Sequence, residues 1–593
     1  MTEHPAPTPQ AMDPLRLASS LAEIAARSQR LTVDFLTRRP DLANLGDPSG
    51  IGRAFLDLTA KMMSDPVSIA NAQIALYWDL ARLWQHATGR LVGADGMPDR
   101  SSGKDRRFQH PAWTEHFVFD FIKQSYEIFA SALLSAVHQV KGLDPKTQHK
   151  AQFYTRQFVD ALAPSNFLAT NPEVLKQTIE TGGQNLLQGL NNLLQDLERG
   201  RGKLAITMTD AKAFRVGENV ATTPGKVIFQ NELMQLIQYA PSTAEVKRRP
   251  LLIVPPWINK FYILDLQPKN SFVKWAVDQG HTVFVISWVN PDERLAHKGF
   301  QDYLLEGPLA ALDAVETATG EREVNAIGYC LGGTLLATTL SYLTAKSEDR
   351  IRSATYFVTL VDFADAGDLA VYIDEQQLAA VEKRMRERGY LEGKDMALVF
   401  NMLRANDLIW SFVVDNYLLG KEPLRLDLLY WNSDSTRMPV EMHSFYLRAM
   451  YHENLLAKPA GITLAGVPID LTRITTPTFM ISTREDHIAP WRSTYAATRL
   501  YRGPIKFVLA ESGHIAGVIS PPGSRYGHYQ NPNLPERPDE WFEGADLVAG
   551  SWWPVWEEWV SQFSGGLVAA RAPGAGGLHP IEDAPGSYVL VRS

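Results

Sequence analysis

The spacing of apolar positions changes near residue 200. Up to that point apolar residues recur at intervals of three and four, which places them on one face of a helix. We therefore predict a helical N-terminal domain over residues 16–205, with the proline-rich residues 1–15 disordered. The apolar faces would be buried either within a helical bundle or against a partner subunit or another apolar surface. The richest of them consists of Leu186, Leu187, Leu190, Leu193, Leu194 and Leu197.

After the glycine-containing break at residues 199–202, apolar residues form short continuous runs. The runs are rich in β-branched and aromatic residues and alternate with helical patterns, which is typical of a mostly parallel α/β sheet. We therefore predict an α/β domain over residues 206–593. The predicted strands are 251–254, 282–288, 324–329, 354–361, 478–482 and 506–510.

Residues 365–450 interrupt this alternation with an aromatic, helical pattern that is too long for a simple crossover. We predict an inserted cap subdomain. Its aromatic residues would either line the underside of a cap over the carboxyl ends of the strands or simply pack the insertion onto the sheet. These residues are Trp410, Phe412, Tyr417, Tyr430, Trp431, Phe445 and Tyr446.

Composition narrows the class of protein. The hydrophobic fraction is 45%, and the net charge of −8 gives no general basic character that would favour nucleic-acid binding. The most apolar long segment, residues 117–137, carries Asp120, Lys123 and Glu127, so we expect no transmembrane segment. The N-terminus lacks the pattern of a signal peptide, and a single cysteine cannot form an intrachain disulfide. We therefore expect a cytoplasmic protein.

The single cysteine lies in the segment Gly328-Tyr329-Cys330-Leu331-Gly332, directly after a predicted strand. This segment matches the nucleophile elbow G-x-S-x-G with cysteine in place of serine, and glycines are needed where side chains would collide in the tight turn. A helix that begins at Leu331 would favour the thiolate through its positive N-terminal end. A lone cysteine is otherwise often a small buried apolar residue, but in this frame we interpret Cys330 as a nucleophile.

Asp486 and His514 follow the predicted strands 478–482 and 506–510. Alone, Asp486 could be a helix N-cap and His514 an ordinary surface or core residue. The order nucleophile, acid, histidine is that of α/β-hydrolase triads, so we predict His514 as general base and Asp486 as its partner. The oxyanion hole would use the backbone N–H of Leu331 and that of Ile258 or Trp257. Because no metal-ligand spacing or nucleotide-binding loop is found, we expect no metal and no cofactor.

A cysteine nucleophile favours thioester chemistry. Transfer of an acyl group from a donor such as acyl-coenzyme A to Cys330 exchanges one thioester for another, and the acyl group stays activated for delivery to a hydroxyl. The sequence therefore predicts an acyltransferase.

Several segments together resemble the class I polyhydroxyalkanoate synthases, in the α/β-hydrolase superfamily. They are residues 255–275, 328–333, 483–491, 512–517 and 583–593, and the resemblance extends from about residue 60 onward. It implies polymerisation of (R)-3-hydroxyacyl-coenzyme A, with 3-hydroxybutyryl-coenzyme A as the expected substrate, into a polyester with release of coenzyme A. It also implies a homodimer at the surface of cytoplasmic storage granules, with dimer, granule and granule-associated protein contacts made by the helical domain.

The resemblance supports Cys330, Asp486 and His514 as the catalytic residues. It further suggests Arg404 and His487 as contacts near the coenzyme A path, although Arg404 could equally form a structural salt bridge. Trp431 would either line the substrate pocket or belong to the core. Two alternatives remain at this point: a thioesterase or polyester depolymerase of the same fold, and a non-catalytic granule-coating protein.

Overall fold

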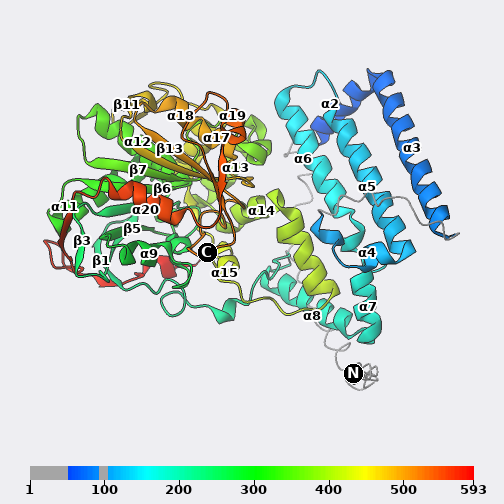
Figure 1. Ribbon diagram of the computed structural model, residues 1–593, viewed down its shortest axis with the longest axis horizontal. Coiled ribbons are helices and arrows are strands. Elements are labelled where there is room, and N and C mark those ends of the chain that lie inside the picture. The colour runs from blue at the N-terminus through cyan, green and yellow to red at the C-terminus, as the bar shows by residue number, and fades with distance from the viewer. Residues whose placement is uncertain (1–50, 92–104, 203, 593) are drawn as a thin grey trace. The chain divides into compact units, whose positions relative to one another are not determined.

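The computed structural model describes residues 51–91, 105–202 and 204–592 (Figure 1). The predicted disordered residues 1–15 lie outside this part of the chain. The described residues form two compact units. The N-terminal part of the first unit ends at Asp210, close to the predicted boundary at residue 205. The first unit also includes Phe400–Arg425, which the sequence pattern assigns to the cap insertion of the α/β domain. The second unit comprises Ala211–Val399 and the chain from Leu426 onward.

The second unit is built on a sheet in which the described residues contribute 11 strands. Its central strands β5, β4, β6, β7, β12 and β13 are parallel, and the flanking strands are antiparallel. This sheet confirms the predicted α/β fold class. In sheet order the strands are β15 (Asp546–Val548), β14 (His528–Gln530), β13 (Ile505–Ala510), β12 (Thr478–Thr483), β7 (Ile351–Phe357), β6 (Val324–Tyr329), β4 (Leu251–Val254), β5 (Val283–Trp288), β2 (Met234–Tyr239), β1 (Gly225–Gln230) and β17 (Glu582–Asp583).

The predicted strands correspond to the parallel strands of the sheet. The largest difference between predicted and observed bounds is at 354–361, where β7 runs from Ile351 to Phe357. Val358 has a φ of 42°, which lies outside the extended region and ends the strand. The flanking antiparallel strands were not predicted; in β2 the buried residues include Gln235 and Gln238, whose polarity hides the strand pattern.

Both faces of the sheet are apolar. Alternate residues of each central strand belong to different hydrophobic cores, as Leu251 and Leu252 of β4 illustrate. Burial on both faces explains why the strands read as continuous apolar runs. The helices over the Leu251 face include α9 (Phe272–Asp278) and α20 (Trp553–Ser561), and those over the Leu252 face include α11 (Ala310–Thr319) and α12 (Leu331–Ala345).

The second unit also contains shorter elements between and around these strands. Its further helices are α10 (Phe300–Leu304), α13 (Glu375–Arg388), α15 (Asp427–Asn432), α16 (Val440–Phe445), α17 (Trp491–Tyr495), α18 (Ala497–Leu500) and α19 (Pro538–Glu543), and α14 (Gly393–Leu403) ends in the first unit. Its small sheets pair β3 (Glu245–Lys247) with β16 (Leu567–Ala569), β8 (Tyr390–Leu391) with β9 (Met438–Pro439), and β10 (Ile462–Leu464) with β11 (Val467–Ile469).

The first unit is helical, as predicted. Its helices α6 and α7 each begin with a side-chain cap followed by proline: Asp144 accepts from Thr147 N, and Asn171 accepts from Glu173 N. The helices are α2 (Ile51–Met63), α3 (Pro66–Leu91), α4 (Ala112–Glu115), α5 (Phe117–His138), α6 (Pro145–Ala161), α7 (Pro172–Glu180) and α8 (Gln184–Arg199), with the π-helical segments η8 (Asn406–Trp410) and η9 (Val413–Leu418).

Helix α8 carries the predicted leucine stripe but buries a different face. Of the predicted leucines, Leu194 is buried, whereas Leu190 is 37% exposed. The buried face instead has Gly189 and Asp196, which lie against η9. A Cβ on Gly189 would be 1.9 Å from the Tyr417 carbonyl oxygen, and the Tyr417 hydroxyl donates to Asp196 Oδ2 at 2.6 Å. Polar and small residues therefore hold α8 to the 400–425 segment.

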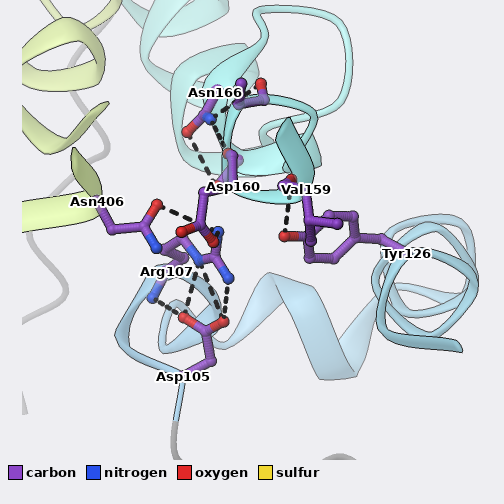
Figure 2. Close-up of polar contacts among 9 residues, drawn as sticks. Asp105, Arg107, Tyr126, Val159, Asp160, Asn166 and Asn406 are labelled. Carbon is purple, nitrogen blue, oxygen red and sulfur yellow. Dashed lines mark hydrogen bonds and ion pairs between the residues drawn. The ribbon is translucent and has the colours of Figure 1, made fainter. Parts of the chain in front are cut away.

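A second polar cluster joins the same segment to the N-terminal helices (Figure 2). The Arg107 guanidinium donates to Asp105 Oδ2 at 2.7 Å, to Asp160 Oδ1 at 3.1 Å and to Asn406 Oδ1 at 3.3 Å. Its carbon also lies 5.5 Å from the ring centroid of Tyr126. These contacts explain why Phe400–Arg425 folds with the helical unit although it is distant in sequence.

Length and hydropathy together decide whether a helix could span a membrane. Among the residues that the structure describes, no single helix is long and apolar enough to cross a bilayer. The bent pair Gly393–Leu403 and Asn406–Leu418 meets both requirements only when its two parts are taken together.

Candidate active site

Cys330 lies in the tight turn between β6 and α12. Its φ is 50° and its ψ is −118°, a conformation that is costly for a residue with a side chain. The turn is held by the Cys330 N–H, which donates to the Phe357 carbonyl at 2.8 Å. A Cβ on Gly332 would lie 2.1 Å from the Val254 carbonyl oxygen, so glycine is required where the helix passes close to β4. The half-buried thiol is thus presented at the carboxyl end of the sheet.

Asp486 and His514 meet at the same end of the sheet, after β12 and β13. His514 Nδ1 lies 2.7 Å from Asp486 Oδ2, and the Asp486 side chain is fully buried. The carboxylate also accepts from Thr483 Oγ1 at 3.1 Å and from the backbone N–H groups of Ile488 and Ala489 at 2.8 and 2.9 Å. Asp486 therefore both caps its own turn and orients the imidazole, which leaves Nε2 available for another partner.

Two opposing effects act on the pKa of His514. Burial lowers it, because the imidazolium loses hydration. The charge of Asp486 and then that of Cys330, together with hydrogen bonds to both, outweigh burial and raise the pKa from its ordinary 6.5 to about 10. The structure therefore brings Asp486 and His514 together, and Cys330 lies close enough to His514 to raise the pKa of its imidazole.

The predicted oxyanion-hole residues lie beside this elbow. In the parallel pairing of β4 with β6, Val254 is opposite Gly328, so the loop that follows β4 leaves the sheet next to Cys330. This loop carries Ile258. Leu331 is the first residue of α12, where backbone N–H groups have no partner within the helix. The two donors thus come from adjacent positions at the end of the sheet, and their role in binding an oxyanion stays a prediction.

An aromatic cluster adjoins the sulfur. The ring centroids of Phe363 and Tyr451 are 4.9 Å apart, and those of Tyr446 and Tyr451 are 5.4 Å apart. Burial raises the pKa of both tyrosines, and the charge of the nearby Cys330 adds to the rise. Tyr446 belongs to the predicted cap aromatics. Phe363 and Tyr451 were not predicted, because each is an isolated aromatic residue in a helical or loop pattern.

The other predicted cap aromatics have different surroundings. Phe445 stacks on Phe300 with ring centroids 5.6 Å apart, and Tyr430 is buried in the core on the Leu251 face of the sheet. Trp410, Phe412 and Tyr417 belong to the first unit. The prediction that residues 365–450 form a single cap is therefore too broad, because part of this segment belongs to the first unit. Of the predicted cap aromatics, Tyr446 is the one that adjoins Cys330.

The structure also places the three predicted substrate contacts. His487 is half-buried on the loop that carries Asp486. Arg404 lies in the first unit and forms an ion pair with Asp407, which is the alternative that the sequence leaves open. Trp431 is buried, and its indole N–H donates to the Lys260 carbonyl at 2.7 Å. Direct contacts of these side chains with a substrate stay predictions.

Sequence reasoning missed the charged residues that surround the loop after β4. Lys260 Nζ lies 2.8 Å from Asp434 Oδ1, and both side chains are buried. Neither residue has a local signal, because their partnership spans a long stretch of chain. Within the described ranges, no group of His, Cys, Asp or Glu side chains is arranged to hold a metal ion.

Family models match two overlapping parts of the chain. Residues 104–276 match the model described as the poly-beta-hydroxybutyrate polymerase (PhaC) N-terminus, and residues 249–521 match the alpha/beta hydrolase fold. The poly(3-hydroxyalkanoate) polymerase of Methylorubrum extorquens is 50% identical over 557 residues, which cover 93% of this chain and 92% of that protein. The chain belongs to the poly(3-hydroxyalkanoate) polymerase family.

Another member of the family is similar over almost the whole length. The PhaC subunit of the Rhizobium meliloti (strain 1021) polymerase is 47% identical, with 98% of this chain and 96% of that protein covered. Among solved structures, a monoacylglycerol lipase of Paleococcus ferrophilus covers 56% of this chain and 98% of its own at 12% identity and a TM-score of 0.30. That score is too low to support an argument, so the fold rests on the sheet itself and on the family model.

Proposed function

We propose that this chain polymerises (R)-3-hydroxyacyl groups from coenzyme A thioesters into polyhydroxyalkanoate, through an acyl thioester on Cys330. Membership of the polymerase family supports the overall reaction. The observation that carries the mechanism is the position of His514, whose Nδ1 binds Asp486 at 2.7 Å and whose pKa is raised by both Asp486 and Cys330.

In the first half-reaction, His514 Nε2 holds the proton of the Cys330 thiol, and the thiolate attacks the thioester carbonyl of the substrate. The negative charge that develops on the carbonyl oxygen is stabilised by the N–H groups of Leu331 and Ile258. The bond to the coenzyme A sulfur breaks, coenzyme A leaves with the proton from His514, and the acyl group is bound to Cys330. One thioester replaces another, so no co-reactant is required.

In the second half-reaction, the 3-hydroxyl of another hydroxyacyl group gives its proton to His514 and attacks the acyl-Cys330 thioester. An ester bond forms, and the Cys330 sulfur leaves and recovers the proton. Asp486 keeps the ring oriented and stabilises its charge in both steps. Water must be kept away from the acyl-enzyme, and the cluster of Phe363, Tyr446 and Tyr451 provides an apolar wall next to the sulfur.

We further propose that the protein acts as a homodimer at the surface of cytoplasmic polyester granules, together with granule-associated proteins. The first unit exposes large apolar residues, among them Trp78 on α3 and Phe129 on α5, which are 56% and 52% exposed. Exposed apolar groups of this size favour contact with a partner or an apolar phase.

His487 is proposed to contact coenzyme A, and the reaction needs no cofactor.

The test uses purified protein and 3-hydroxybutyryl-coenzyme A. We expect release of coenzyme A together with insoluble polymer. Cys330→Ala should abolish both while its circular dichroism spectrum matches that of the wild type. Release of coenzyme A with free 3-hydroxybutyrate as the sole product would instead identify a hydrolase. Activity of more than a few per cent in folded Cys330→Ala would exclude Cys330 as the nucleophile.

A further inference from the structure

The loop that carries the proposed oxyanion donor is bound by a second loop, residues 433–436, which follows α15. Thr436 N–H donates to the Ile258 carbonyl at 3.3 Å, and Thr436 Oγ1 donates to the Trp257 carbonyl at 2.5 Å. The next pair along the two loops, Asn259 and Ser435, forms an isolated antiparallel bridge. The second loop thus follows the backbone of residues 257–259 like a short strand, and fixes the direction of its peptide groups.

A buried ion pair closes this contact at its far end. Lys260 Nζ lies 2.8 Å from Asp434 Oδ1, and Tyr262 Oη donates to Asp434 Oδ2 at 2.9 Å. The Lys260 and Asp434 side chains are 3% and 4% exposed. Taking two charges out of water is costly, so a buried pair is weak evidence for stability, but the removal of one partner leaves an uncompensated buried charge.

The C-terminal tail supplies the second partner of the Lys260 ammonium. Lys260 Nζ donates to the carbonyl of Val589 at 2.7 Å, and the Val589 side chain is buried. The tail continues along the same region, where Asn290 Nδ2 donates to the Val591 carbonyl at 3.2 Å and Arg592 binds the Tyr430 hydroxyl. The ammonium therefore joins three separate parts of the chain within two residues of Ile258.

Competing effects act on the charge of Lys260. Burial lowers its pKa, and the Asp434 carboxylate opposes this effect, while the charge of Arg592 lowers the pKa further. Without Asp434, the ammonium would be both buried and near another cation. Each residue of the pair therefore stabilises the charged form of the other. Loss of either one leaves a buried, unpaired charge beside the loop.

We propose that Lys260 and Asp434 are positioning residues for acyl transfer. Their ion pair, completed by the Val589 carbonyl, holds the Ile258 peptide so that its N–H meets the developing oxyanion. This inference rests on the proposed function. It extends the machinery to residues that touch neither the substrate nor the triad, and it makes the docked C-terminal tail a support of the loop.

The first variant is Lys260→Met, which keeps much of the side-chain length but has no charge and no donor. We expect kcat for coenzyme A release to fall about 100-fold, because a misplaced oxyanion donor costs transition-state stabilisation. KM should change less than about twofold, since the donor acts mainly on the transition state. Alkylation of Cys330 by iodoacetamide should keep its wild-type rate, because that reaction needs the thiolate and no oxyanion hole.

A second variant separates positioning from stability. Lys260→Met combined with Asp434→Asn removes both charges, and the amide oxygen of the introduced asparagine is still able to accept from Tyr262. We expect the double variant to unfold at a higher temperature than Lys260→Met alone, while kcat stays as low. If restored stability also restored kcat, the pair would act on folding and not on the loop, and the proposal would be overturned.

The matched control is Lys247→Met, which removes another largely buried lysine that pairs with Glu557. Lys247 lies in β3, and its N–H binds the Gly280 carbonyl near the start of β5, at the end of the sheet opposite Cys330. This variant should lose stability but keep kcat per folded molecule. An equal loss of kcat in both lysine variants, measured well below their unfolding temperatures, would overturn the proposal.

Hydrogen exchange of the peptide covering residues 255–262 tests the loop without any activity. Exchange should be faster than in the wild type in Lys260→Met and in a variant truncated after Ser587, which lacks Val589. In the control Lys247→Met, exchange should keep the wild-type rate. Unchanged exchange in Lys260→Met would overturn the positioning role even if activity fell. A wild-type protein that releases no coenzyme A would instead refute the proposed function, and the exchange result would still decide whether Lys260 holds the loop.

Discussion

Replacing Asp486 by Asn tests how the catalytic pair holds its proton. In the structure, Asp486 Oδ2 accepts from His514 Nδ1 at 2.7 Å, and Oδ1 accepts from Ile488 and Ala489. Asparagine keeps the size of the side chain but removes the charge. If its oxygen stays on the two backbone N–H groups, its amide group faces Nδ1 as a donor and favours the wrong tautomer of the ring.

The magnitude follows from the pKa of His514. A rise from 6.5 to about 10 corresponds to about 5 kcal/mol in favour of the protonated ring, since each pKa unit is about 1.4 kcal/mol. Asp486 is the largest of the effects that raise this pKa, and burial opposes them. Loss of the charge should therefore lower the pKa of His514 and weaken the thiolate–imidazolium pair by at least about tenfold at neutral pH, which corresponds to about one pKa unit.

Alkylation of the single cysteine provides the assay, because every label reports on Cys330. In the wild type, the raised pKa of His514 should keep its imidazole protonated from about pH 7 to about pH 9, where it stabilises a Cys330 thiolate. In Asp486→Asn, the alkylation rate at pH 7 should be at least about tenfold lower than in the wild type, because the imidazolium that stabilises the thiolate is itself less stable. Coenzyme A release should fall by at least the same factor.

The reasoning fails if Asp486→Asn is alkylated at the wild-type rate at pH 7. Such a result would mean that Asp486 does not hold the charge of His514. A selective loss of coenzyme A release would then place its main role in activation of the incoming hydroxyl. His514→Gln serves as the comparison, because it removes the base and should lower alkylation at least as much as Asp486→Asn.

Three further outcomes follow from particular contacts. Gly332→Ala should yield little active protein, because its Cβ would lie 2.1 Å from the Val254 carbonyl oxygen; wild-type activity in this variant would contradict the elbow packing. Burial lowers the pKa of His443 from 6.5 to about 4. Between these pH values the histidine is protonated in the unfolded state but not in the folded state, so the free energy of unfolding should fall by about 3 kcal/mol as the pH is lowered to 4. In urea unfolding, the decrease in the free energy of unfolding should be smaller by about 3 kcal/mol in His443→Asn than in the wild type. The same pH dependence in both proteins would show that His443 does not cause the decrease. Tyr451→Ala should raise the share of free 3-hydroxy acid relative to polymer, and an unchanged ratio would show that its ring does not exclude water from acyl-Cys330.

Local sequence determined the central part of the catalytic unit. The parallel strands are buried on both faces, so each appears as a continuous apolar run, and the elbow glycines stand where the backbone leaves no room for a Cβ. Cys330, Asp486 and His514 each follow a predicted strand, which was sufficient to expect them at one end of the sheet, and in the structure His514 lies beside Asp486 and close to Cys330.

Tertiary structure decided the features that depend on polar partners far away in the chain. Strand β2 buries Gln235, whose amide donates to Ser587 at 3.1 Å and whose carbonyl accepts from Tyr588 N–H at 3.1 Å. Helix α8 buries Asp196 against Tyr417 in place of most of its leucines. No local pattern indicates such burial, because a polar side chain is favourable inside a protein only when a specific partner is present.

The same reason explains why the sequence indicates the proposed triad but not the residues proposed to position the loop after β4. Cys330 and its neighbours carry a motif that requires the chain to turn sharply at that point, so the sequence alone locates the proposed nucleophile. Lys260 and Asp434 carry no such motif and would each be expected at the surface. They become buried partners only when the loops after β4 and α15 meet the C-terminal tail, because each charge is stable there only in the presence of the other.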